Sequence, residues 1–235
     1  MTDMDPVGGG HAAISDDYAE GIVDSIAAEA VRRAVTVAWM AVLLGLAVQL
    51  LMIALNLGLG AGWPGVALLG DVAQGVSWAI LVCIGLAVGT VASRDRALVM
   101  GLLGLVSGPV AWGLAKGAQR TVQAAMDLAP AGVDLFFLAV CAAKGVEYAV
   151  LGALLGHLSQ HEVTRIRSYL VLGTLVGIAA AATLTGLNLW RAAQAGTALP
   201  AARLIGLAVN EFVFPIGCAL VICMALRMKR LVGLR

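Results

Sequence analysis

Six long apolar segments dominate the sequence and restrict the folds open to it. They span residues 34–57, 72–93, 97–118, 133–158, 168–190 and 203–226. About 20 consecutive apolar residues suffice for a helix to cross a bilayer, where only helices and closed barrels satisfy their backbone hydrogen bonds. The chain is 61% hydrophobic and 12% charged, whereas a soluble domain is about 25% charged. We therefore predict an all-α integral membrane protein, a bundle of six transmembrane helices over residues 34–228.

Basic residues between these segments predict how the helices are oriented. Cytoplasmic loops of membrane proteins are enriched in Lys and Arg. Four basic residues fall on one predicted side, namely Lys116, Arg120, Arg191 and Arg203. Ten fall on the other side, namely Arg32, Arg33, Arg94, Arg96, Arg165, Arg167, Arg227, Lys229, Arg230 and Arg235. We expect both termini to be cytoplasmic and the chain to lie in a bacterial inner membrane.

A pattern of polar residues recurs three times along the chain. Each odd segment follows a pair of arginines and leads to an amide: Asn56, Gln119 and Asn188. Each outer loop contains a proline, and each even segment then contains a polar residue: Gln74, Lys144 and Asn210. An aromatic residue lies at the same place in each copy: Trp78, Tyr148 and Phe214. We predict three tandem two-helix hairpin repeats, about residues 32–93, 94–164 and 165–230, in a pseudo-threefold arrangement.

Two opposite charges, Lys144 and Glu147, lie inside the fourth apolar segment. At about 1.5 Å per residue, Lys144 lies about 14 Å from Leu135 and about 21 Å from Leu158. Neither charge is therefore at a helix end, and a charge at this depth requires a partner. The i, i+3 spacing places both on one face, and repeat position makes Glu211 or Gln74 the nearest expected partner. The pair could lock helix packing, line a solute path or contact another subunit.

A polar ring follows from the repeat alignment, because its members would lie at similar depth in the outer half of the bundle. The ring comprises Gln74, Lys144, Glu147, Asn210 and Glu211. Such residues could line a water-filled path or bind a polar solute, although interhelical hydrogen bonding is the simpler role. We predict a channel or transporter for a small solute or ion. The alternative is a non-catalytic subunit that scaffolds or anchors a larger membrane complex.

The N-terminal region is polar and differs from the rest of the chain. We expect residues 1–15 to be a disordered tail. Residues 16–33 are expected to form an acidic amphipathic cytoplasmic helix that leads into the first membrane helix, since Asp17 and Glu20 have capping-box spacing. This helix could bind a cytoplasmic partner, and the glycine-rich membrane segments would suit a homo-oligomer or a larger complex.

Other function classes find little support in the sequence. No serine-protease or metalloprotease motif lies in the apolar segments, so we expect no enzyme and no cofactor. His157 and His161 have the i, i+4 spacing of a metal pair, but further ligands are not evident, so they are only a weak metal candidate. The four cysteines lie in apolar segments and are expected to pack as apolar residues. The net charge of +1 argues against nucleic acid as a partner.

The asymmetry of basic residues makes the orientation testable by cysteine labelling. A membrane-impermeant thiol reagent added from outside should label cysteines introduced at Gly65, Ala131 and Ala198, because these positions fall in the predicted outer loops. Cysteines at Ser93 and Ser168 should stay protected until the membrane is opened. The labelling is measured in intact cells after replacement of the native cysteines. The reverse pattern would invert the predicted topology.

Overall fold

The computed structural model describes residues 10–60, 62–63, 65–90, 95–126 and 134–231. Within them the chain forms six helices and no strand: α1 (Gly10–Gly58), α2 (Ala67–Gly89), α3 (Arg96–Ala125), α4 (Leu135–Gln160), α5 (Ile166–Gln194) and α6 (Ala201–Leu231). Each contains a stretch long and apolar enough to cross a membrane. The prediction of an all-helical chain with six membrane-spanning candidates is therefore confirmed, and the helices indicate an integral membrane protein.

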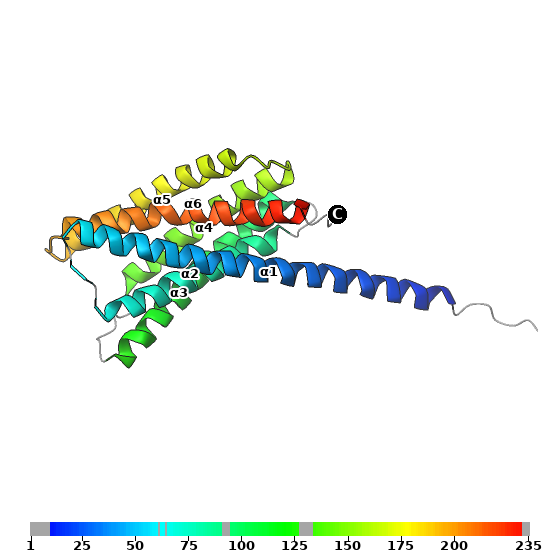
Figure 1. Cartoon of the computed structure of the whole chain (residues 1–235), viewed down its shortest axis with the longest axis horizontal. Helices are drawn as coiled ribbons and strands as arrows, with labels where there is room; N and C mark the ends of the chain where they lie inside the picture. Colours follow the sequence, from blue (N-terminus) through cyan, green and yellow to red (C-terminus); the bar gives the residue numbers. More distant parts are fainter. Residues whose placement is uncertain (1–9, 61, 64, 91–94, 127–133, 232–235) are drawn as a thin grey trace, which may run out of the picture.

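Several helices are longer than the sequence predicts, and α1 and α3 extend furthest past their predicted ends. The first begins at Gly10, so residues 10–15 are helical where a disordered tail is expected, while residues 1–9 lie outside the described part. It continues without a break into the bundle, and its N-terminal half projects beyond the other helices (Figure 1). The third helix ends at Ala125, well past the expected end at residue 118. That extension places Arg120 inside a helix rather than in a loop.

The helices pack in sequence order, and α1 closes the arrangement by packing against α6 (Figure 1). In addition, α6 contacts α2 and α4. The membrane-span windows of α2, α4 and α6 are 44, 33 and 50% buried, against 22–28% for the odd helices. The even helices are therefore more buried in the bundle than the odd helices. We call the end of the bundle at which α2, α4 and α6 begin the vestibule end, because a cavity opens there.

Glycines bring the backbones of α3 and α4 close together. Gly104 lies against the backbone of Tyr148, and Gly108 lies against the carbonyl group of Lys144. A Cβ atom at position 108 would be 2.6 Å from that carbonyl oxygen. Lipid offers no hydrophobic drive for helices to associate, so such packing depends on small residues at the interface. The glycines of α3 thus fix where α4 holds Lys144.

Glycines also bring the backbones of α5 and α6 close together, next to a proline of α6. Gly173 faces Pro215 and Ile216, and Gly177 faces Phe212. Pro215 is fully buried within α6, and its missing N–H leaves a carbonyl group one turn earlier without its helical partner. Close packing against α5 shields this region from lipid. Residue 211, one turn before the proline, is thereby held in the interior.

We predict that Gly108→Ala lowers the free energy of unfolding by about 1–3 kcal/mol, because the added methyl group forces α3 and α4 apart. Gly113→Ala on the same helix is the matched control, since no other atom lies within 4 Å of a Cβ at that position. The control should unfold like the native chain or slightly later. Unfolding is measured by denaturant titration in detergent. Equal stability of both variants would contradict the close backbone approach.

Candidate functional site

Lys144 lies at the centre of a buried ion cluster that joins α4 to α6. Its Nζ atom donates to Oε2 of Glu147 at 2.9 Å and forms a close ion pair with Oε2 of Glu211. The side chains of the three residues are 2, 6 and 5% exposed. We call Lys144, Glu147 and Glu211 the Lys144 cluster. With all three ionised it carries a formal charge of −1.

Aromatic rings complete the surroundings of the lysine. Its Nζ atom lies 5.1 Å from the ring centroid of Trp78 and 5.7 Å from that of Tyr148. The two rings contact each other edge to face at 5.2 Å. A desolvated ammonium group gains from such cation–π contacts. Residues that the repeat pattern aligns, Trp78, Lys144 and Tyr148 among them, thus meet in one place.

A second polar network connects α2 with α3. Lys116 donates to Oε1 of Gln74 at 2.9 Å and to Oε1 of Gln119 at 2.8 Å. The amide nitrogen of Gln119 then donates to Asp71 at 2.7 Å. The ammonium group of Lys116 also lies 4.9 Å from the ring centroid of Trp112. Gln74 therefore accepts from Lys116, and the described hydrogen bonds of Lys144 go to Glu147 and Glu211 instead.

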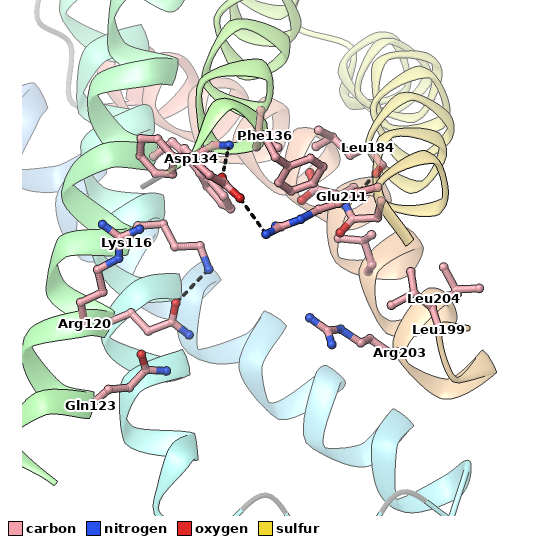
Figure 2. Close-up of a pocket in the computed structure, with 17 residues that line it drawn as sticks. Lys116, Arg120, Gln123, Asp134, Phe136, Leu184, Leu199, Arg203, Leu204 and Glu211 are labelled. Atoms are coloured by element: carbon pink, nitrogen blue, oxygen red, sulfur yellow. Dashed lines mark hydrogen bonds and ion pairs between the residues drawn. The ribbon is translucent and has the colours of Figure 1, made fainter. Parts of the chain in front are cut away.

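A cavity of about 440 Å³ opens at the vestibule end, between α3, α4, α5 and α6. We call it the vestibule. Figure 2 shows its polar side chains arranged around an open centre, with Arg203 reaching in from α6. Glu211 lines the vestibule, so the cavity extends to a member of the Lys144 cluster. Of the three members of the Lys144 cluster, Glu211 is the one that lines this cavity.

Asp134 connects α4 and α5 at the opening of the vestibule. Its side chain accepts a hydrogen bond from the backbone N–H of Phe137 at 2.9 Å, which caps the N-terminus of α4. The second carboxylate oxygen pairs with Arg191 of α5 at 2.7 Å (Figure 2). The guanidinium group of Arg191 also lies over the ring of Phe136. One residue thus starts a helix and ties α4 to α5 across the opening.

The structure brings together only part of the predicted polar ring. Lys144, Glu147 and Glu211 meet in one cluster, whereas Gln74 belongs to the Lys116 network. No described contact joins Asn210 to either group. The Lys116 network and the vestibule are missing from the sequence-based site. The regular spacing of Trp112, Lys116, Gln119 and Gln123 along one helix face could have revealed them.

The histidine pair lies away from both networks, near the end of α4. The rings of His157 and His161 are 4.2 Å apart between centroids, and the carbonyl oxygen of His157 lies 3.0 Å from Nδ1 of His161. In the part of the chain that the structure describes, no group of three or more His, Cys, Asp and Glu residues could hold a metal ion. The pair therefore stays a weak candidate with two ligands.

No protein-family model matches this chain, and no curated protein or solved structure matches it. The Lys144 cluster, the Lys116 network and the vestibule therefore carry the information on function, because function depends on the chemistry of sites rather than on the fold.

We predict that Lys144→Met destabilises the fold by about 3–5 kcal/mol, because it leaves two buried carboxylates side by side without a counterion. The triple variant Lys144→Met/Glu147→Gln/Glu211→Gln removes all three charges together and should recover most of that loss. Free energies of unfolding are measured in detergent for both variants. If the triple variant were as unstable as the single one, the cost would come from packing rather than from an uncompensated charge.

Proposed function

We propose that this protein is a non-catalytic membrane channel or transporter for a small solute or ion. The observation that carries the proposal is the vestibule, a cavity of about 440 Å³ that ends on Glu211 of the Lys144 cluster. Buried charges without functional use are costly in a membrane, about 2.5–3.5 kcal/mol each on insertion scales. A cavity that leads to such charges gives them access to a polar solute. Polar cavities of this kind are where transporters bind their substrates.

The charges around the vestibule favour an anion. Four basic residues line it, Lys116, Arg120, Arg191 and Arg203, against two carboxylates, Asp134 and Glu211. Asp134 is paired with Arg191, and Glu211 with Lys144. The wall therefore carries a surplus of two positive charges. A low-dielectric cavity lined by one sign of charge concentrates ions of the opposite sign.

Aromatic and aliphatic side chains separate these charges along the wall. Trp112, Phe136 and Leu207 are among them. Such a lining accepts the apolar part of an organic molecule, while a few polar groups fix its orientation. We therefore infer that the solute is a small organic anion with a carboxylate or phosphate group.

The three-hairpin repeat fits this function, and we propose it with cytoplasmic termini in a bacterial inner membrane. Its support is the inside position of α2, α4 and α6 and the meeting of Trp78, Tyr148 and Lys144 with Glu211. In this orientation the vestibule opens to the outside. If the repeats are real, the three hairpins should superpose on one another with the same handedness: residues 32–93, 94–164 and 165–230.

The projecting part of α1 favours a second candidate function, a subunit that scaffolds a larger complex. The helix is 49 residues long, about 74 Å at 1.5 Å per residue, which is more than twice what a bilayer requires. Its N-terminal half extends beyond the bundle (Figure 1), and Val31 and Val35 are 63 and 54% exposed. A cytoplasmic partner or a second copy of the chain could cover this half.

Uptake into proteoliposomes tests the transport proposal. We predict that Arg203→Gln lowers the uptake of small organic anions several-fold at low ionic strength, and much less at high salt, because a charge at the rim acts by attracting the solute. Benzoate, succinate and inorganic phosphate serve as labelled probes. Arg167→Gln is the matched control, an exposed arginine at the start of α5, away from the vestibule end.

Two results would decide against this proposal. If the protein took up a cation or a neutral solute, and Arg203→Gln had no effect on that uptake, transport would be supported but the choice of an anion would be wrong. If no probe crossed, while removal of residues 1–27 released a bound partner from the complex in native membranes, the scaffold would be the function.

A further inference from the structure

A second cavity lies on the opposite side of α4 from the α3 interface. It is a groove of about 540 Å³ between α4 and α5, which we call the α4–α5 groove. Its lining is apolar apart from Glu147 and Thr183, and it includes Val146, Val150 and Leu175. Those three side chains are 60, 47 and 63% exposed. In a bilayer this surface faces lipid, so the groove is open to molecules dissolved in the membrane.

The sequence of α4 explains why the groove exists. The glycines of α4, Gly145, Gly152 and Gly156, all face α3 or α2. The face toward α5 instead carries Ala143, Val146, Glu147, Val150 and Leu154, which keep the two backbones apart. Consequently α4 and α5 contact each other less extensively than any other pair of consecutive helices. The groove is therefore a property of this helix face, although Leu184 lines both the groove and the vestibule.

The carboxylate of Glu147 is only half satisfied. Its Oε2 atom accepts from Lys144 at 2.9 Å, whereas its Oε1 atom is buried and accepts no hydrogen bond of ordinary geometry within the described residues. The hydroxyl group of Tyr148 lies near this carboxylate but also makes no such bond. An unpaired carboxylate oxygen in an apolar setting costs free energy, because it has lost its water without gaining a donor. The side chain is 6% exposed and lines the groove. A donor that enters along the groove would supply the missing bond.

Charge selects the kind of donor. Lys144 is shared by two carboxylates, which leaves a formal surplus of one negative charge in the Lys144 cluster. A single positive charge would neutralise it. Because α4 and α5 run antiparallel, Thr183 lies at the same end of the groove as Glu147, and its hydroxyl oxygen can accept a second hydrogen bond. The volume of the groove is within the range of small-molecule sites.

We propose that the α4–α5 groove binds a lipophilic monocation of the ammonium class, taken up from the membrane. Its apolar body lies along Val150, Leu154 and Leu175, and its ammonium group donates to Oε1 of Glu147. The site is separate from the vestibule and takes a ligand of opposite charge. The proposal therefore stands or falls independently of anion transport.

Photolabelling of the full-length protein in nanodiscs of zwitterionic lipid tests this site. The probe is a long-chain primary amine that carries a diazirine in its chain, and the comparison is the alcohol of the same chain. Labelled peptides are mapped by mass spectrometry. We expect the amine to label residues of the groove at least five-fold more than the alcohol does. An excess of unlabelled long-chain amine should remove the labelling.

Two substitutions of the same size locate the binding. Ala179→Leu fills the groove, since Ala179 lines it, and should reduce the labelling at least five-fold. Ala182→Leu adds the same bulk at an exposed position of α5 outside the lining and should leave it unchanged. Glu147→Gln removes the charge and should abolish the preference for the amine over the alcohol.

Three results would overturn the proposal. Equal labelling by amine and alcohol in the native chain would show that the charge of Glu147 is not recognised. Labelling that Ala179→Leu leaves intact would place the ligand outside the groove. Stronger labelling by the alcohol would assign the groove to a neutral lipid. The Ala179→Leu result remains decisive even if Glu147→Gln fails to fold.

Discussion

A lysine ammonium group that is buried away from water needs anionic partners, and this requirement links the inner helices α4 and α6. Lys144 receives one carboxylate from its own helix and one from α6. Apart from this contact, α4 and α6 meet over a short stretch only. The ion pair therefore sets the distance between two inner helices that side-chain packing alone holds weakly. Such a pair contributes more to the uniqueness of the arrangement than to its net stability, since desolvation offsets most of the attraction.

The two faces of α4 explain how one helix borders two different cavities. On one face, small residues let α3 approach until Gly108 lies against the carbonyl group of Lys144. On the other face, larger side chains hold α5 away and leave the α4–α5 groove. Close contact on the first face holds α4 against α3, so the second face does not need close packing with α5 to keep α4 in place. Rigid support of this kind is what a binding site needs.

The sequence predicts the helices well, because twenty-residue apolar stretches have few other structures open to them. It also predicts that Lys144 and Glu147 share a face and that Glu211 or Gln74 is the partner of Lys144. The structure pairs Lys144 with Glu211, whereas Gln74 accepts from Lys116. The depth of the charges and their repeat positions carry that information. These signals are local or periodic, so they can be read without knowledge of the tertiary packing.

The vestibule is less accessible to sequence reasoning. The sequence places Lys116 near the outer end of the third apolar segment, because a charge in such a run normally marks its boundary. In the structure α3 continues to Ala125, and Gln74 and Gln119 solvate the ammonium group inside the bundle. The groove is equally hidden, because it depends on which face of α4 meets which neighbour. The predicted end of a helix is wrong where a polar residue of another helix takes the place of water around a charged side chain.

Lys144 connects the two cavities through its two carboxylates. Glu211 lines the vestibule, and Glu147 lines the α4–α5 groove, while one ammonium group holds both. If the proposed ammonium ligand binds Glu147, it would compete with Lys144 for that carboxylate and so strengthen the pairing of Lys144 with Glu211. If the proposed anion binds in the vestibule beside Glu211, it would disfavour the negative charge of that carboxylate. Both ligands would then act on the charges that Lys144 holds, and thermodynamic linkage would require that each changes the affinity of the other by the same factor.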